Sequence, residues 1–155
     1  MNLTIIDDDK LSGQIFYFSD EYAFETKPRP PFWNSVLIDN LELILDVDGR
    51  VTGVWGLCPH SCWKQNKFTL PKYRCGGVIF EKFSSFESRI PISIAINWEV
   101  QYDNQKKWIY IGKSNHFCEH IEVLSGLILS IENNFLRSIW IRINEEKHIY
   151  SERLT

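Results

Sequence analysis

The chain has 155 residues, of which 44% are hydrophobic, 14% aromatic and 24% charged, and its formal net charge is −3. This length is typical of one domain, and the composition excludes a disordered or collagen-like chain. The sequence contains no run of about 18 apolar residues, the length that a helix needs to cross a bilayer. Its acidic start, with Asp7, Asp8 and Asp9, differs from the basic and then apolar start of a signal peptide. We therefore expect one globular domain over residues 1–155, in the cytoplasm and without membrane contact.

The first third of the chain is acidic. Residues 1–49 contain ten acidic and three basic residues. Because complementary charge steers association and disfavours wrong partners, this bias predicts a cationic protein partner. The alternative is that the carboxylates only keep the protein soluble. The acidic side chains expected to contact the partner are Asp7, Asp8, Asp9, Asp20 and Glu21.

Two proline-containing segments, residues 26–34 and 58–72, are predicted to be irregular, because proline lacks the main-chain N–H that pairs a strand with its neighbours. Loops of this kind often carry binding residues. Trp33 lies in the first segment and Trp63 in the second. Both tryptophans are therefore predicted to be interface residues, since large flat rings supply contact area at low entropy cost.

A β-hairpin is predicted around Asp48-Gly49. Leu43, Leu45 and Val47 alternate before this pair, and the apolar residues Val51, Val54, Trp55 and Leu57 follow it. Asp-Gly favours a type I′ turn, whose two central residues both need positive φ. Four other tryptophans lie within strand patterns here and further along the chain. These are predicted to be core residues: Trp55, Trp98, Trp108 and Trp140.

The most unusual stretch is Cys-Pro-His-Ser-Cys-Trp at residues 58–63. One alternative function is a cysteine-dependent enzyme, in which Cys58 or Cys62 is the nucleophile and His60, His116 or His120 the base. Another is a zinc-supported binding domain, although zinc knuckles usually contain two close cysteine pairs and this spacing differs. The candidate zinc ligands are Cys58, Cys62, Cys75, His116, Cys118 and His120.

No catalytic sequence motif is present. The chain has no G-x-S-x-G, no phosphate-binding glycine loop and no H-E-x-x-H. Without an export signal, the four cysteines are expected to be reduced thiols. We therefore favour a protein without enzymatic activity, metal or cofactor, and keep sugar or peptide binding on an exposed tryptophan as a further alternative.

The middle of the chain is basic, with seven basic and two acidic residues over residues 50–89. Lys64, Lys67, Lys72 and Arg74 alternate with aromatic residues, a composition that also occurs on nucleic-acid-binding surfaces. The overall negative charge argues against that function. We expect these cations to form a solvated face, and expect no nucleic-acid partner.

The second half is predicted to contain two more hairpins. Residues 92–102 should pair with residues 108–111 through the polar run 103–107, and the apolar residues of 121–131 should pair with 135–141 through Asn133-Asn134. A helix over residues 117–128 is the alternative, but Gly126 interrupts it and the alternating pattern is longer. The fold class predicted is mainly β: antiparallel hairpins forming a single sandwich or half-open barrel, with few short helical turns.

Residues 41–80 and the last hairpin resemble immunity proteins of bacterial contact-dependent or polymorphic toxin systems. The resemblance rests on Gly53-Val54-Trp55-Gly56, Cys58-Pro59, Ser61-Cys62-Trp63-Lys64, Pro71 and Gly76-Gly77. It implies a cytosolic, non-enzymatic protein that binds and neutralises a cognate toxin domain, commonly a basic nuclease, through a charge-complementary surface.

Overall fold

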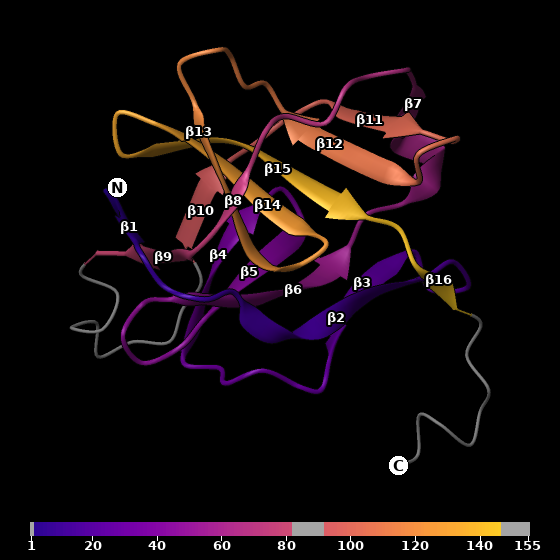
Figure 1. Ribbon diagram of the computed structural model, residues 1–155. Helices are drawn as coiled ribbons and strands as arrows, with labels where there is room; N and C mark the ends of the chain where they lie inside the picture. Colours follow the sequence, from indigo (N-terminus) through magenta and orange to yellow (C-terminus); the bar gives the residue numbers. More distant parts are fainter. Residues whose placement is uncertain (1, 82–91, 147–155) are drawn as a thin grey trace.

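The protein is built almost entirely of β-strands, as Figure 1 shows for the computed structural model, which describes residues 2–81 and 92–146. A mainly β fold was predicted and is confirmed. The single helical turn among the described residues is the 3₁₀ turn η1 (His60–Cys62). The strands are β1 (Leu3–Ile6), β2 (Leu11–Phe18), β3 (Ala23–Lys27), β4 (Asn34–Ile38), β5 (Leu41–Leu45), β6 (Val51–Leu57), β7 (Lys64–Gln65), β8 (Arg74–Cys75), β9 (Gly77–Phe80), β10 (Ile92–Ala95), β11 (Val100–Asp103), β12 (Trp108–Gly112), β13 (Glu119–Ser125), β14 (Leu127–Glu132), β15 (Phe135–Arg142) and β16 (Glu145–Glu146).

The β5–β6 hairpin is confirmed, but its turn is not type I′. Of the pair Asp48-Gly49, only Gly49 has positive φ, at 83°. The Gly49 N–H donates to the Asp46 carbonyl at 3.0 Å, and the Asp46 carboxylate accepts the N–H groups of Asp48 and Arg50 at 2.9 and 3.0 Å. An aspartate at the first position stabilises a type I turn in this way, and a glycine with positive φ then completes the hairpin as a bulge.

The last hairpin, β14–β15, has the predicted turn. Asn133 and Asn134 have φ values of 51° and 66°, which a type I′ turn requires. The strand preceding it is not continuous, however. The predicted run 121–131 divides at Ser125-Gly126, where Gly126 has a φ of 86°, into the antiparallel pair β13 and β14. The prediction of strand rather than helix is therefore confirmed, and the glycine marks a turn.

The hairpin predicted from residues 92–102 is only partly correct. β11 pairs with β12 in the antiparallel register Asp103↔Trp108, as expected. Residues 92–95 instead form β10, which pairs in parallel with β4. Other parallel neighbours are β7 with β11, β8 and β2 with β13, and β16 with β2. Such pairings join distant segments of the chain, so local alternation does not reveal them.

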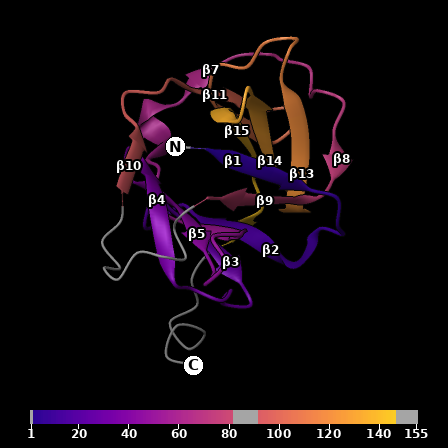
Figure 2. The same ribbon diagram turned by 90° about the vertical axis from the view of Figure 1, so that its left-hand side faces the viewer.

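One large sheet contains most of the strands, in the order β10-β4-β5-β6-β3-β2-β13-β14-β15-β12-β11-β7, and curls into a half-barrel (Figures 1 and 2). A second, two-stranded sheet of β1 and β9 crosses its inner side, as Figure 2 shows. Aliphatic side chains from both sheets fill the space between them, including Leu3, Val78 and Leu129. No helix among the described residues is long and apolar enough to cross a membrane.

A smaller apolar cluster lies on the outer face of β12, β14 and β15. Trp108, Ile128 and Trp140 form it, and Phe68 and Leu70 pack against it. The Trp140 ring stacks on Tyr110 with centroids 3.8 Å apart and planes 10° apart. Residues 66–73, which we call the strap, therefore cover this face with apolar side chains.

Candidate functional site

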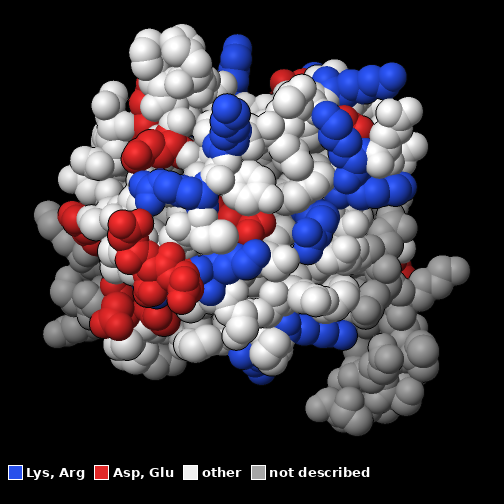
Figure 3. Space-filling view, viewed as in Figure 1, with Lys and Arg blue, Asp and Glu red and all other residues white. Residues whose placement is uncertain are grey.

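Acidic side chains from three separate segments form one surface, which we call the acidic cluster. The β1–β2 connection supplies three of them, the β5–β6 turn two, and the residue after β9 one. Figure 3 shows the carboxylates gathered on one side of the molecule. The members of the acidic cluster are Asp7, Asp8, Asp9, Asp46, Asp48 and Glu81.

Arg50 connects these segments. Its guanidinium donates to the Asp8 carboxylate at 2.8 Å and to the Asp9 carbonyl at 3.0 Å. The β5–β6 turn is fixed to β9 by the hydrogen bond from the Phe80 N–H to the Gly49 carbonyl, at 2.8 Å. The Glu81 carboxylate accepts the hydroxyl of Thr4 on β1. The small sheet and the hairpin thus hold the carboxylates in one place.

The acidic cluster keeps an excess of negative charge. The hydrogen bond from Arg50, reinforced by the Asp9 N–H, holds the pKa of Asp8 below its usual value, so Asp8 stays ionised. Arg74 lies 3.4 Å from the Asp7 carboxylate and 3.7 Å from that of Glu119. These two guanidiniums face six carboxylates, so the cluster can attract a cationic surface over the screening length of physiological salt.

Two of the predicted acidic residues lie elsewhere. Asp20 and Glu21 follow β2, whereas Asp7, Asp8 and Asp9 precede it. An eight-residue strand separates its two ends by about 25 Å. The structure therefore does not place Asp20 and Glu21 in the acidic cluster.

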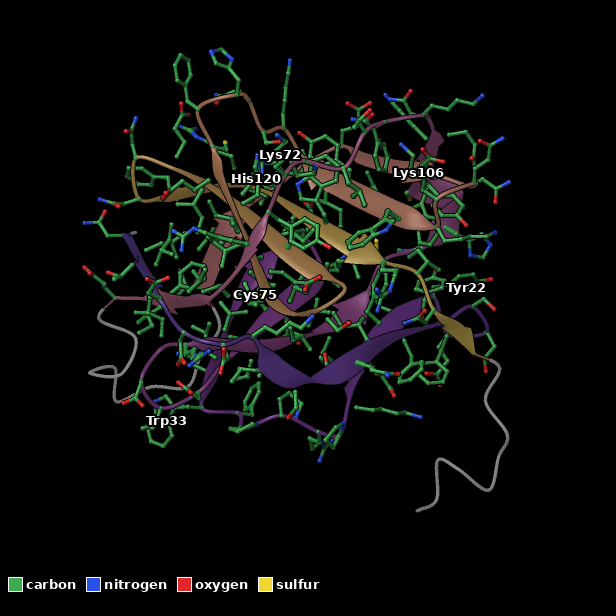
Figure 4. All side chains as sticks on the ribbon, in the orientation of Figure 1. Tyr22, Trp33, Lys72, Cys75, Lys106 and His120 are labelled. Carbon is green, nitrogen blue, oxygen red and sulfur yellow. The ribbon has the colours of Figure 1, made fainter. Side chains whose placement is uncertain are left out.

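The two predicted interface tryptophans occupy different environments. Trp33 is half-buried, and its main-chain N–H donates to the Leu45 carbonyl at 2.7 Å, directly before the β5–β6 turn. Its side chain lies at the lower left edge of the molecule in Figure 4. Trp63 instead packs against the core, with its ring centroid 5.0 Å from those of both Tyr17 and Tyr102. Trp33 thus adjoins the acidic cluster, and Trp63 is mainly a packing residue.

No protein-family model matches the chain, and no curated protein matches its sequence. Function therefore has to be inferred from the chemistry of the surface.

Sequence reasoning missed Asp46, Asp48 and Glu81 as members of the cluster. Asp46 and Asp48 do carry a signal, because they flank a predicted turn and loops present their side chains to solvent. Glu81 carries none, since its position depends on the pairing of β9 with β1, which are distant in sequence.

The candidate zinc ligands are not brought together. Among residues 2–81 and 92–146, no three His, Cys, Asp or Glu side chains are grouped so that they could hold a metal ion. Cys62 and Cys75 are exposed in different segments, and His116 stacks on Phe117 with centroids 3.9 Å apart. Burial raises the pKa of the Cys58 thiol to about 11, so this cysteine is protonated at neutral pH and is a poor nucleophile.

His120 belongs to a buried polar network rather than to a metal site. Its Nδ1 lies 2.6 Å from the Ser130 hydroxyl, which accepts the Trp140 indole N–H at 2.9 Å. Because Ser130 accepts from Trp140, its own proton can be donated to His120. Burial lowers the pKa of His120, which favours the neutral ring that this donation needs. Ser130 is fully buried and His120 is partly exposed, so the hydrogen bond ties the imidazole to the packed interior of the sheet.

A carboxylate and a main-chain carbonyl of β11 hold the strap: the Tyr102 carbonyl accepts the N–H of Asn66 at 3.0 Å. Asp103, at the end of β11, accepts the N–H groups of Phe68 at 3.3 Å and of Gln105 and Lys106 at 3.1 Å. The N–H of Lys106, with those of Phe68 and Gln105, lowers the pKa of Asp103. The loop that the sequence singled out as irregular is therefore anchored to the sheet.

We expect low pH to weaken the hydrogen bonds that the Asp103 carboxylate accepts. The pKa of Asp103 is lower in the folded protein than its unfolded value of about 3.9, so ionised Asp103 stabilises the fold above about pH 4, and the contribution is lost as the pH falls through the folded-state pKa. Asp103→Asn should lower the free energy of unfolding at neutral pH and flatten its decline in acid. Urea unfolding between about pH 2 and 7 measures this. The exposed Asp20→Asn is the control, and parallel acid declines in wild type and Asp103→Asn would contradict the expectation.

Proposed function

We propose that the protein is a non-enzymatic binding module that neutralises a cationic toxin domain, as an immunity protein does. The observation that carries this proposal is the convergence of six carboxylates from three segments on one surface, with two guanidiniums among them. The local folding of the two segments does not by itself require Asp9 and Asp48 to lie near each other. An acidic cluster built from remote segments supports a role in recognition.

Charge complementarity suits an inhibitor. A negatively charged surface raises the association rate with a positively charged partner by about 10- to 1,000-fold, and inhibitors of secreted toxins must bind before damage occurs. Nucleases attract the phosphate backbone with lysine and arginine. A cluster of carboxylates can occupy the same cationic groove, and the half-buried ring of Trp33 beside it provides an aromatic anchor.

The resemblance to bacterial immunity proteins gives the proposal its biological context. It covers residues 41–80, which include the β5–β6 turn with Asp46 and Asp48. The cytoplasm is the compartment in which such a protein would act. A nuclease is the favoured partner, because its substrate is an anion and its groove is therefore basic.

Affinity capture from a lysate of the source organism tests the proposal. The wild-type protein is the bait at low and moderate salt, and retained proteins are identified by mass spectrometry. We expect a stoichiometric partner with a basic domain, released as salt screens the interaction. Absence of any protein partner at both salt concentrations would contradict the proposal.

Charge reversal then locates the interface. Asp9→Lys with Asp48→Lys should slow association with the captured partner at least about tenfold at low salt, because both carboxylates belong to the acidic cluster. Asp20→Lys with Glu21→Lys changes the net charge equally at the other end of β2 and is the matched control. Stopped-flow or surface-based kinetics measure the rates. An equal slowing by both pairs would show that net charge, and not the acidic cluster, steers the encounter.

A further inference from the structure

A groove lies on the outer face of β3, β5 and β6, and it is separate from the acidic cluster. Its volume is about 510 Å³, which is within the usual range of small-ligand sites. Two exposed aromatic rings and four charged side chains line it. These are Trp55, Phe32, Glu25, Glu42, Lys27 and Arg29.

Trp55 was predicted to be a core residue, and this prediction is wrong: its exposed fraction is 51%. The two neighbours of Trp55 in β6, Val54 and Gly56, are buried, so the strand turns the indole to the outer face. Glu42 of β5 lies directly across from Trp55 in the strand register. An indole of this size, left half-exposed in the middle of a sheet face, is available to a ligand.

The wall of the groove is the proline segment that follows β3. Pro30 packs over Gly53, where an added Cβ would lie 3.1 Å from the proline ring and 2.7 Å from the Thr26 hydroxyl. The Thr52 hydroxyl donates to the Pro31 carbonyl at 2.9 Å. These contacts hold the exposed ring of Phe32, whose exposed fraction is 54%, at the edge of the groove. The wall of the groove is therefore held in place by the contacts of this proline segment with β6.

Recognition in this groove depends on side chains. β3, β5 and β6 are interior strands, each with a neighbour on both sides. β3 pairs with β6 only at Ala23 and Phe24; beyond this point the Thr26 hydroxyl donates to the Val54 carbonyl and accepts the Val54 N–H, both at 2.9 Å, so a side chain fills the gap where a further strand would have to pair. A ligand can instead be bound by stacking and by hydrogen bonds to side chains.

The charges in the groove balance. Glu25 and Glu42 are acceptors, and Lys27 and Arg29 are donors, so the lining has no formal net charge. The Ser35 hydroxyl orients Glu42 at 2.7 Å, and the ammonium of Lys27 lies 5.0 Å from the Phe18 ring centroid. Neither an anion nor a cation is favoured by such a lining, whereas a neutral ligand with many hydroxyls can use both donors and acceptors.

We propose that this groove binds a neutral saccharide, with the apolar face of one sugar ring stacked on Trp55 and its hydroxyls hydrogen-bonded by Glu42 and Arg29. Pyranose rings present a flat face of C–H groups, which packs on an aromatic ring, and hydroxyls at their edges. Phe32 contacts the neighbouring sugar unit. This activity is independent of the toxin-neutralising function proposed above.

Titration with neutral soluble oligosaccharides of glucose, xylose, mannose and N-acetylglucosamine tests the proposal. The readout is the NMR resonance of the Trp55 indole N–H, assigned by its loss in Trp55→Phe. We expect one of these oligosaccharides to shift this resonance saturably. Trp55→Ala should weaken binding at least tenfold, measured by calorimetry.

Two variants serve as controls. Leu57→Ala removes an exposed apolar side chain two residues along the same strand, outside the groove, and Phe135→Ala removes an exposed aromatic ring of β15 that does not line it. Both should bind the sugar as wild type does. The proposal is overturned if none of the oligosaccharides shifts the Trp55 resonance up to about 10 mM, if Trp55→Ala binds normally, or if an arginine-containing peptide binds the groove and the sugars do not.

Discussion

Gly49→Ala is expected to lower the free energy of unfolding by about 2–4 kcal/mol. Gly49 has a φ of 83°, a conformation that costs an alanine about 1–2 kcal/mol. An added Cβ would also lie 2.4 Å from the carbonyl oxygen of Phe80, which is main chain and cannot rotate away. Either the β5–β6 turn or β9 must therefore move.

The control for this prediction is Gly126→Ala. Gly126 has nearly the same φ, 86°, but its added Cβ would lie 3.2 Å from the Cβ of Arg142, a contact that a movement of a few tenths of an ångström relieves. We expect a loss of about 1–2 kcal/mol, from the backbone conformation alone. Urea unfolding of both variants provides the comparison. Equal losses would mean that the contact between Gly49 and β9 is unimportant.

Trp140→Ala should cost about 3–5 kcal/mol of unfolding free energy, whereas Trp55→Ala should cost less than about 1 kcal/mol. Trp140 is only 4% exposed, stacks on Tyr110, meets the Phe68 ring edge at a centroid distance of 5.4 Å and donates to Ser130. Its removal leaves a cavity beneath the strap. Trp55 has open solvent on one side of its ring.

The two substitutions delete the same side chain, so they measure burial directly. Chemical unfolding at neutral pH, followed by far-ultraviolet circular dichroism, gives both values on one scale. A further expectation is faster amide exchange in residues 66–73 of Trp140→Ala, because the strap loses its packing surface. Similar losses for the two variants would refute the assignment of opposite environments.

Trp55 and Trp140 show why the local sequence pattern does not predict whether a side chain on a sheet is buried. Each follows a β-branched residue in a strand, Val54-Trp55 and Ile139-Trp140, and both were predicted to be buried. The local pattern places both on the outer face of the sheet. Trp140 is buried because the strap crosses that face, and Trp55 is exposed because the described part of the chain leaves its face open. Burial here depends on a distant segment.

The hairpins were predictable because their signals are local. Apolar alternation and turn residues with positive φ lie within a few positions of one another, as in Asn133 and Asn134. The parallel pairs β10–β4 and β8–β13 have no such signal, since their partners are separated by long stretches of chain. The acidic cluster depends on the same kind of contact, which explains why its Asp7 to Asp9 segment was recognised and Glu81 was not.

The two-stranded sheet has a consequence for the proposed interface. An isolated pair of strands is at best marginally stable in water, but β1 and β9 bury Leu3, Val78 and Phe80 in the common core. Opening of this pair would therefore expose the core as well as separate Asp8 and Glu81 from Asp48. The carboxylates are thus held in place before any partner arrives, and a partner that contacts all three segments loses little affinity to ordering them.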